Sequence, residues 1–316
     1  MPGLPKEKEL ITIMADHRIH RKADIMENFT NTFVNIPKKA AAINDLTGFG
    51  RCSLAVVLPV LNAMGLQACP IPTSVFSSHM AFPSYYYRDL SAELSPFLAE
   101  YETLQLTFDG IYCGFLNSQQ QFAPLERFME RQRKAGSPII LIDPVLGDRG
   151  RTYRIVTEAL CQRMKHFISR ATIITPNLTE ACLLTDTAFP DPSADDAFLQ
   201  MLTEKLLAMG PVKTVITGIE QGSRIRNYCG ERNGNTLSTF SCDVISNGES
   251  RPGTGDLFAA ILIADAVNHV PFAVSVRKAA DFVRICVEQS ALARVPIREG
   301  VIFENRLSVL WDENNG

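Results

Sequence analysis

The sequence predicts an α/β fold in which helices cover both faces of a mostly parallel central sheet. From residue 38 onward, short apolar runs that are typical of strands alternate with longer runs that have helical periodicity. Several of the short runs are apolar throughout, as expected for strands of a parallel sheet that is buried on both faces. The chain has 316 residues, 46% of them hydrophobic, and is therefore long enough to bury a large core.

The first part of this pattern supplies three strands and two helices. In order along the chain they are the strand 40–44, the helix 53–64, the strand 67–71, the helix 91–104 and the strand 110–113. Gly65 follows the first helix directly, and glycine is the usual residue just past a helix end. Alternation of this kind predicts parallel neighbours rather than a run of hairpins.

The central part continues the alternation with four helices and three strands. They are the helix 123–135, the strand 139–142, the helix 157–168, the strand 172–175, the helices 179–184 and 194–208, and the strand 214–217. Gly136 ends the first of these helices, and Asp143-Pro144 ends the strand before it can extend. Pro176 separates the strand 172–175 from the helix that follows.

The last part contains a hairpin and two helices. Strand-like residues 225–228 and 236–242 flank a turn at 230–235 that is rich in glycine and asparagine, and the helices 255–267 and 274–293 follow. Residues 1–36 are rich in charge and differ from the rest, so we predict an N-terminal extension outside the core and one domain over residues 37–316.

Composition excludes several classes of protein. The net charge of −3 gives no basic footprint for nucleic acid or an anionic membrane surface. No apolar run reaches the length of a bilayer, and the first residues lack the apolar core of a secretory signal. None of the eight cysteines forms a Cys-x-x-Cys pair, which favours buried free thiols. We therefore expect a cytoplasmic protein with a small-molecule ligand.

The most informative stretch is Gly253-Thr254-Gly255-Asp256, which leads directly into an apolar helix. A glycine-flanked turn that opens a helix offers free N–H groups and the positive end of the helix dipole to an anion such as phosphate. An aspartate in the first helical turn can accept a proton from a hydroxyl group beside that phosphate. The alternative is an ordinary turn in which Asp256 only caps the helix.

Two further polar clusters follow strands of the predicted sheet. Asp143 and Asp148 come after the strand 139–142, and Asn177 and Glu180 come after the strand 172–175. Carboxylate and amide oxygens at the carboxyl ends of parallel strands suit Mg²⁺ and polyphosphate. The alternatives are solvated loop charges for the aspartates and a helix capping arrangement for Asn177 and Glu180.

Two familiar nucleotide sites are excluded or disfavoured. The chain has no Gly-x-x-x-x-Gly-Lys-Ser/Thr sequence, which excludes a P-loop. Gly48-Phe49-Gly50 invites a dinucleotide interpretation, but Ser53 stands where the third glycine belongs and no acidic residue closes the second strand. We predict instead that this loop brings backbone close to a small ligand, with Asn44 and Asp45 as polar contacts.

These motifs resemble the ribokinase-like superfamily and, within it, the pyridoxal (vitamin B6) kinase branch. The motifs that carry the resemblance are GTGDLFAA at 253–260, DPVLGD at 143–148, TPNLTE at 175–180 and FSSH at 76–79. The resemblance covers about residues 39–302 and implies the ribokinase-like three-layer α/β/α fold. It also implies ATP and Mg²⁺ as cofactors, a monovalent cation such as K⁺, and a homodimer.

The resemblance implies roles for individual residues. Asp256 would be the catalytic base, and the amides of Gly253, Thr254 and Gly255 would form the anion hole. The implied ligands and contacts are Asp143, Asn177 and Glu180 for the metal, Asp148, Tyr153 and Thr217 for the nucleotide, and Asn44, Asp45, His79 and Phe115 for the substrate.

The expected activity is ATP-dependent phosphorylation of the 5′-hydroxymethyl group of pyridoxal, pyridoxine or pyridoxamine. The substrate pocket departs from the usual pattern, because Asn44-Asp45 stand where many relatives have serine and Phe115 replaces an aromatic hydroxyl. Phe115 can stack on a ring but cannot donate a hydrogen bond. A hydroxymethylpyrimidine kinase of thiamine synthesis and a non-catalytic pyridoxal-phosphate binder on the same fold remain as alternatives.

Overall fold

The computed structural model describes residues 36–190, 194–234, 236–245 and 250–311. Residues Lys38–Asp312 group into one compact unit. Residues 1–35 of the predicted extension lie outside the described residues, so the division of the chain into an extension and a domain stays a prediction. Within the described ranges, no helix combines the length and the apolar character that a membrane span requires.

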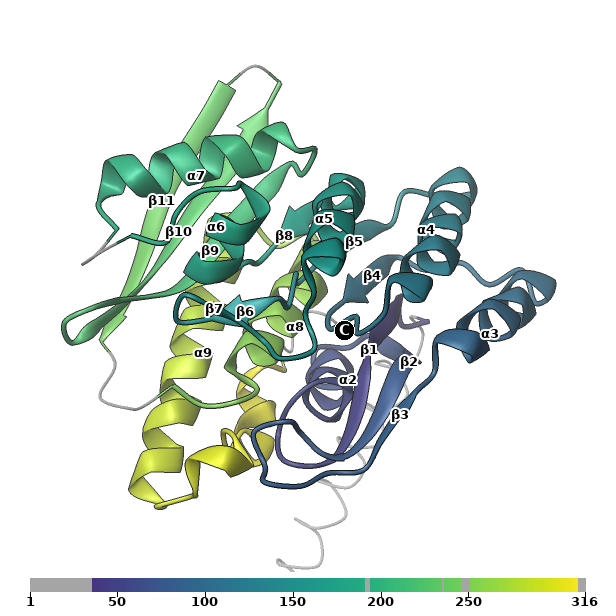
Figure 1. Ribbon diagram of the computed structural model, residues 1–316, viewed down its shortest axis with the longest axis horizontal. Helices are drawn as coiled ribbons and strands as arrows, with labels where there is room; N and C mark the ends of the chain where they lie inside the picture. Colours follow the sequence, from purple (N-terminus) through teal and green to yellow (C-terminus); the bar gives the residue numbers. More distant parts are fainter. Residues whose placement is uncertain (1–35, 191–193, 235, 246–249, 312–316) are drawn as a thin grey trace, which may run out of the picture. The chain divides into compact units, whose positions relative to one another are not determined.

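A sheet of nine strands forms the middle layer of this unit, in the order β11-β10-β9-β8-β5-β4-β1-β2-β3 (Figure 1). The strands are β1 (Lys39–Phe49), β2 (Gln67–Ser78), β3 (Tyr87–Asp89), β4 (Gly110–Cys113), β5 (Ile139–Ile142), β8 (Ile173–Ile174), β9 (Lys213–Gln221), β10 (Arg224–Asn233) and β11 (Thr236–Ile245). The strands from β9 through β8, β5, β4 and β1 to β2 pair in parallel. At one edge β3 pairs antiparallel with β2, and at the other edge β10 pairs antiparallel with both β9 and β11.

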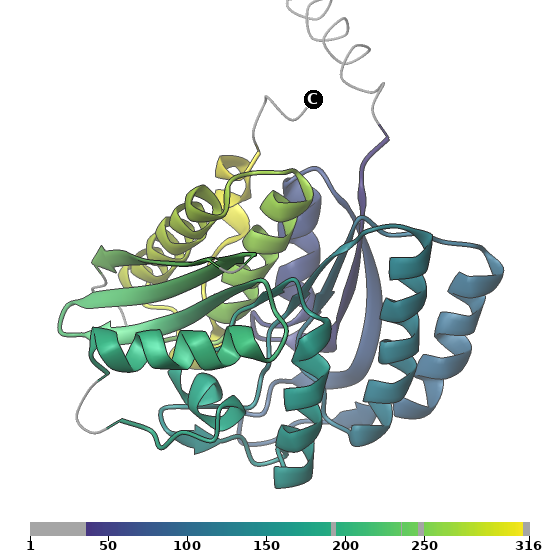
Figure 2. The same cartoon turned by 90° about the horizontal axis from the view of Figure 1, so that it is seen from above.

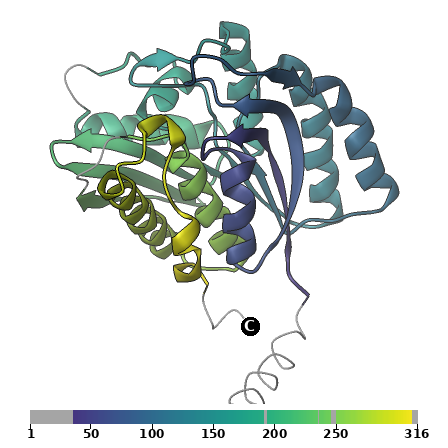
Figure 3. The same cartoon turned by 90° about the horizontal axis from the view of Figure 1, so that it is seen from below.

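Helices cover both faces of the sheet (Figure 2). On one face lie α2 (Leu54–Ala63), α8 (Thr254–Val267) and α9 (Phe272–Leu292); on the other lie α3 (Ser91–Thr103), α4 (Phe122–Ala135), α5 (Glu158–Phe167), α6 (Leu178–Leu184) and α7 (Asp196–Ala208). Figure 3 shows α2, α8 and α9 together over their face. Short 3₁₀ segments are Gln119–Gln121, Ile168–Arg170, Ile297–Glu299 and Glu304–Val309.

The alternation of side chains along β1 explains why its sequence is apolar throughout. Ala40 and Ala42 pack into the core under α2, α8 and α9, whereas Ala41 and Ile43 pack into the core on the opposite face. A strand buried on both faces needs apolar residues at every position. The predicted three-layer α/β/α fold with a mostly parallel sheet is therefore confirmed.

The predicted elements agree with the structure except at the ends of strands and in short irregular strands. β1 and β2 run on to Phe49 and Ser78, so residues 45–49, expected in a loop, continue the sheet. The two strands pair throughout this extension, with a bulge between Asn44 and Leu46. Backbone pairing therefore outweighs the polar and glycine-rich composition that suggested a loop.

The hairpin is present, but its strands are longer and its turn shorter than expected, because β10 and β11 stay paired from Arg224 with Ile245 to Asn233 with Thr236. Three short strands were not predicted: β3, and β6 (Gly147–Asp148) with β7 (Arg151–Thr152), which form a separate small hairpin. All eight cysteines are free and most are buried, as expected.

Candidate active site

The start of α8 is shaped for close approach to a ligand. Gly253 has φ 86°, a left-handed conformation that favours glycine, and a Cβ placed there would lie 2.1 Å from the carbonyl oxygen of Arg51. The helix begins at Thr254, so its first N–H groups have no partner within the helix and carry the positive end of its dipole. Gly255 is exposed, which leaves these amides accessible to an anion.

Asp256 lies in the first turn of α8, and three donors fix its carboxyl group. Oδ1 accepts hydrogen bonds from Nδ2 of Asn44 and from the hydroxyl of Tyr112, both at 3.1 Å. Oδ2 accepts one from the backbone N–H of Ser53 at 2.7 Å. Burial raises the pKa of Asp256, and the three donors act in the opposite direction by favouring the charged form.

Asp143 faces the start of α8 from the end of β5. Its Oδ1 accepts a hydrogen bond of 2.9 Å from the Thr175 hydroxyl, and its Oδ2 lies 3.7 Å from the position of a Cβ on Gly255. Burial and the nearby charge of Asp256 raise the pKa of Asp143 to about 7. The loop after β5 and the turn before α8 therefore meet at the carboxyl edge of the sheet, as the sequence predicts.

Asn177 and Glu180 form the capping arrangement that the sequence left as an alternative. Oδ1 of Asn177 accepts from the N–H of Glu180, and Oε2 of Glu180 accepts from the N–H of Asn177. The other Glu180 oxygen accepts from the N–H of Leu146, and Nδ2 of Asn177 donates to the carbonyl of Gly147. The pair thus ties the start of α6 to the loop after β5.

The acids at this edge also interact electrostatically. Burial and the charge of Asp143 raise the pKa of Glu180 well above its ordinary value. A cation placed among these carboxylates would offset the free-energy cost of ionising them where burial shields them from water. Among the described residues, no three His, Cys, Asp or Glu side chains lie close enough to hold a metal by themselves. The donors suit Mg²⁺ held by one or two carboxylates together with waters and phosphate oxygens.

The candidate nucleotide residues lie on the α6 side of this edge. Burial and the charges of Glu180 and Asp148 raise the pKa of Tyr153. Asp148 is exposed in the small β6–β7 hairpin. Thr217 is joined to the α6 turn because its N–H donates to the carbonyl of Pro176 at 2.9 Å. Thr217 and the β6–β7 hairpin are thus both joined to the start of α6.

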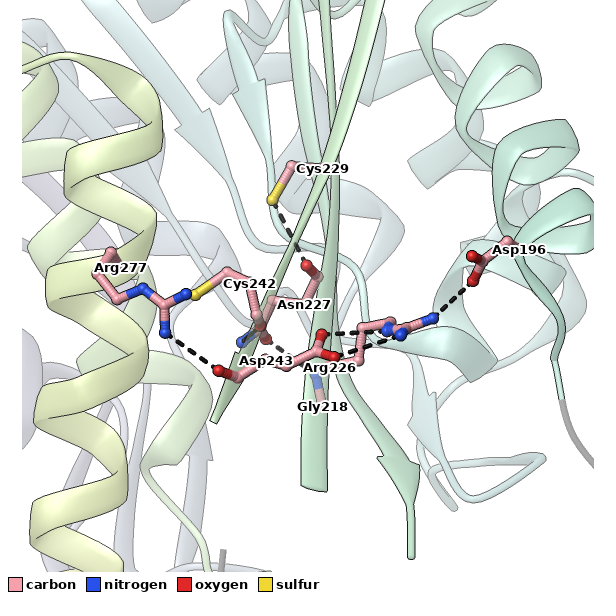
Figure 4. Close-up of polar contacts among 8 residues, drawn as sticks. All are labelled: Asp196, Gly218, Arg226, Asn227, Cys229, Cys242, Asp243 and Arg277. Carbon is pink, nitrogen blue, oxygen red and sulfur yellow. Dashed lines mark hydrogen bonds and ion pairs between the residues drawn. The ribbon is translucent and has the colours of Figure 1, made fainter. Parts of the chain in front are cut away.

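A polar network supports the strand that carries Thr217 (Figure 4). The N–H of Gly218 donates to Oδ1 of Asn227, which sits where the pairing of β9 and β10 is interrupted. Beside it, Arg226 donates to both carboxylate oxygens of Asp243 and also to Asp196 at the start of α7. The network joins β9, β10, β11 and α7.

The candidate substrate residues divide into two groups. Asn44 is buried, its Oδ1 accepts from the N–H of Phe115 at 2.9 Å, and its Nδ2 donates to Asp256, so its polar atoms are already engaged within the protein. Asp45 is also buried and accepts from Thr47 and Ser53. Of the predicted substrate contacts, Asn44 therefore bonds the candidate base directly, whereas Asp45 is linked to it through Ser53 and Phe115 through Asn44.

His79, the fourth predicted substrate contact, is more exposed than Asn44 and Asp45, and both of its ring nitrogens contact the protein backbone. Its Nε2 is 2.6 Å from the carbonyl of Arg298, and its Nδ1 accepts a hydrogen bond from the N–H of Ala81. Its ring packs on Phe82 and against Gly50, where a Cβ would come within 2.5 Å of it. Burial lowers the pKa of His79, which favours the neutral ring that donates from Nε2.

Sequence reasoning missed two residues that touch Asp256. Tyr112 lies in the fully buried strand β4, and a tyrosine in an otherwise apolar strand is a signal for a buried hydroxyl that needs a partner. Ser53 reaches Asp256 through its backbone, and no side-chain pattern signals such a contact.

Comparison with known proteins identifies the relatives of this chain. The family model for phosphomethylpyrimidine kinase matches residues 98–298. The pyridoxal kinase of Homo sapiens is 28% identical over 230 residues, which span 66% of this chain and 71% of the human protein. The resemblance to pyridoxal kinases in the sequence motifs is thus confirmed.

Solved structures agree with this result. A protein of Bacteroides thetaiotaomicron named for phosphomethylpyrimidine kinase, and solved with pyridoxal, is 33% identical with a TM-score of 0.77; the match covers 87% of this chain and 96% of that one. A pyridoxal kinase of Lactobacillus plantarum is 27% identical with a TM-score of 0.79, covering 88% and 98%. The ribokinase-like arrangement is therefore shared along nearly the whole described unit.

Proposed function

Because the chain belongs to the phosphomethylpyrimidine kinase family, we propose that it transfers the γ-phosphoryl group of ATP to the 5′-hydroxymethyl group of a B6 vitamer. The vitamers considered are pyridoxal, pyridoxine and pyridoxamine. The observation that carries the proposal is the geometry of Asp256, a carboxylate fixed by three donors at the mouth of α8. A relative of 33% identity, solved with pyridoxal, supports the choice of substrate.

The residues of the chain divide the reaction between them. Asp256 accepts the proton of the substrate hydroxyl as the oxygen attacks the γ-phosphorus and the bond to the β-phosphate oxygen breaks. The amides of Gly253, Thr254 and Gly255 stabilise the charge on the transferring phosphoryl group. Asp148, Tyr153 and Thr217 contact the nucleotide, and Asn44, His79 and Phe115 form the substrate side.

The acids support a metal requirement. Asp143, Asn177 and Glu180 would hold Mg²⁺, mainly through waters, since their donors suit an ion shared with phosphate. When bound, Mg²⁺ neutralises charge on the phosphates. A monovalent cation such as K⁺, assembly as a homodimer and a cytoplasmic location belong to the same proposal, on the strength of the family resemblance.

A second candidate substrate is the hydroxymethylpyrimidine of thiamine synthesis. It is favoured by the family model, whose description is phosphomethylpyrimidine kinase. Both substrates present a hydroxymethyl group on a flat nitrogen ring, so the same base and anion hole serve either. A non-catalytic binder is disfavoured, because the chain keeps an aspartate in the first turn of α8 directly after a glycine turn.

An ADP-release assay with pyridoxal, pyridoxine, pyridoxamine and hydroxymethylpyrimidine tests the proposal. We expect the highest kcat/KM with one of the B6 vitamers and a strict requirement for Mg²⁺. Preference for the pyrimidine would replace the B6 assignment with the second candidate. Absence of turnover with all four substrates would contradict the kinase proposal for this ring class.

Asp256→Asn tests the base directly. Loss of the proton acceptor should lower kcat by about 10²- to 10⁴-fold, with KM for ATP nearly unchanged. A suitable control is Asp195→Asn, because Asp195 caps α7 through the N–H of Phe198 and asparagine caps equally well. Turnover of Asp256→Asn close to that of the control would show that another group takes the proton.

A further inference from the structure

Ser53 has a backbone conformation that non-glycine residues rarely adopt. It immediately precedes α2 with φ 57° and ψ −141°. Serine at this position usually accepts a hydrogen bond from an N–H of the first helical turn, but the Ser53 side chain makes no such bond. The local sequence therefore does not account for the conformation, and contacts from outside the loop must hold it.

Two carboxylates supply those contacts. The Ser53 hydroxyl donates to Oδ1 of Asp45 at 2.6 Å, and the Ser53 N–H donates to Oδ2 of Asp256 at 2.7 Å. Ser53 is nearly buried, so both bonds are shielded from water. One residue thus connects an acid on β1 with the candidate base on α8.

Asp45 is placed for this task beside an irregularity in the pairing of β1 with β2. Asn44 pairs with Pro72 and Leu46 pairs with Val75, so Asp45 alone lies opposite two residues of β2, Thr73 and Ser74. Bulges of this kind change where nearby side chains point and are common beside active sites. The Asp45 carboxylate is 5% exposed, and its second oxygen accepts from the Thr47 hydroxyl at 2.8 Å. Both of its oxygens therefore face hydroxyl groups of the chain.

The bonds to Asp256 distinguish its two oxygens. Oδ1 has two donors, Asn44 and Tyr112, which occupy both of its lone-pair directions. Oδ2 has one donor, the Ser53 N–H, and keeps one direction free. A substrate hydroxyl can therefore be accepted at Oδ2, the oxygen whose position Ser53 sets.

We propose that Ser53 and Asp45 are positioning residues for the base: Asp45 anchors the Ser53 hydroxyl, which keeps the strained Ser53 peptide turned so that its N–H orients Oδ2 of Asp256 toward the substrate. This inference rests on the proposed kinase function. It departs from the expectation that Asp45 contacts the substrate, because both Asp45 oxygens already accept hydrogen bonds within the protein.

The choice of residue at this position supports a role for the hydroxyl. Gly50 and Gly253 occupy the positive-φ positions nearby, whereas position 53 carries serine at φ 57°. Glycine would adopt this conformation without strain. The Ser53 hydroxyl reaches Asp45 and thereby fixes the peptide in one orientation, which glycine has no side chain to do.

The first test compares Ser53→Ala, Asp45→Ala and the double variant. Each single change removes the anchor, so kcat should fall about 10- to 100-fold, since small misplacement of a reacting group has effects of this size. KM for both substrates should stay within about threefold, because the interaction acts in the transition state. Since both changes remove the same bond, the double variant should be no slower than the worse single variant.

Thr157→Ala provides the matched control. Thr157 caps α5 through the N–H of Leu160 and is exposed, away from Asp256. The Thr157→Ala substitution should lower Tm, because a helix cap is lost, and should leave kcat unchanged. Equal losses of kcat in Thr157→Ala and Ser53→Ala would mean that the loss in Ser53→Ala comes from lower stability alone, which would overturn the inference.

Glycine at position 53 gives a rescue. In the Asp45→Ala background, Ser53→Gly should raise kcat, because glycine adopts φ 57° without an anchor and still offers its N–H to Asp256. A further fall in kcat in this double variant would contradict the proposed role of the anchor. Single variants with kcat within about twofold of wild type would contradict it as well.

Hydrogen exchange of the Ser53 amide tests the inference without turnover. Asp45→Ala should speed exchange of this amide at least about tenfold, whereas the Ile111 amide in β4 should be unaffected, since only a local opening is made easier. Unchanged exchange at Ser53 overturns the positioning role whatever the wild-type protein phosphorylates. Altered exchange in a protein inactive on all four substrates would sustain the Ser53 geometry and overturn only the kinase proposal.

Discussion

At the scale of single residues, burial is the main influence on the acids of the site. Asp45, Asp143 and Asp256 each have a pKa above the ordinary value, first because of burial. Each also accepts hydrogen bonds that favour the charged form. The sequence supplied the acids at these positions, but their proton affinities depend on neighbours brought from other segments.

The raised pKa of Asp45 predicts that the free energy of unfolding depends on pH, and Asp45→Asn tests this. Burial raises the pKa of Asp45 from 3.8 to about 6, so the folded protein holds this proton more tightly than the unfolded chain. The stability that this provides is complete at low pH and is lost as pH rises from about 4 to about 6. The loss is on the order of 3 kcal/mol for a shift of this size.

Asparagine removes this titration and still accepts the Ser53 hydrogen bond. The free energy of unfolding of Asp45→Asn minus that of wild type should therefore rise between pH 4 and pH 6. Urea unfolding at a series of pH values measures it. A flat difference across this range would mean that Asp45 has an ordinary pKa in the folded protein.

At the scale of elements, the site depends on how strands end and helices begin. Asp45 in β1 lies opposite a bulge in β2, and α8 begins after a glycine in the left-handed region. Arg51, between these two elements, packs its carbonyl oxygen against Gly253. The same close approach brings the Ser53 amide to Asp256, so the loop before α2 and the start of α8 form one unit.

Gly253→Ala tests this close approach against a matched control. Gly222 also has a positive φ but has nothing within 4 Å of an added Cβ, so Gly222→Ala should cost only about 1 kcal/mol of strain. Gly253→Ala adds a clash at 2.1 Å with backbone and should cost at least about twice as much. Chemical unfolding compares them; equal losses would show that the loop can move away freely.

At the scale of the whole molecule, parallel strands bring distant residues to one edge of the sheet. Asp143 and Asn177 follow β5 and β8 at the carboxyl ends of the parallel strands, and the start of α8 comes close to Asp143 there, as is general for ligand sites of open α/β sheets. The hydrophobic cores on the two faces hold these ends in place. Polar links such as that of Arg226 add support at the β9–β11 side.

Arg226→Ala tests this support. Arg226 donates to Asp243 and Asp196 from a side chain that is 19% exposed. Its loss leaves Asp243 short of partners and should cost about 1–3 kcal/mol. Lys134→Ala breaks an exposed pair with Glu130 within α4 and should cost less than about 0.5 kcal/mol. Similar costs in thermal unfolding would show that the Arg226 network contributes nothing beyond a surface pair.

Removal of the metal tests whether the acids at the carboxyl edge of the sheet bind Mg²⁺. Mg²⁺ with ATP should raise Tm more than ATP with a chelator, because a ligand that binds only the folded state stabilises it, by about 2.7 kcal/mol at a hundredfold excess over Kd. Asp143→Asn should abolish most of this difference, since its carboxylate faces Gly255. A difference in Tm equal to that of wild type would exclude Asp143 from the metal site.

The fold and much of the site could be predicted from local patterns. Apolar periodicity located the helices and the central strands, and the turn at 253–256 located the candidate base. The lengths of β1 and β2 could not be predicted, because they depend on pairing between strands rather than on propensity. Ser53 was missed because its contribution is a backbone N–H, which has no sequence signature.

The sequence by itself determined the class of fold, the acids at the strand ends and the glycine-flanked helix start, because periodicity and turn chemistry are local properties. Only the tertiary structure decided that Asp45 accepts hydrogen bonds from Thr47 and Ser53, and that Ser53 orients Asp256. The physical reason is that hydrogen bonds and burial join atoms that are close in space, and residues 45, 53 and 256 become neighbours only when the sheet assembles.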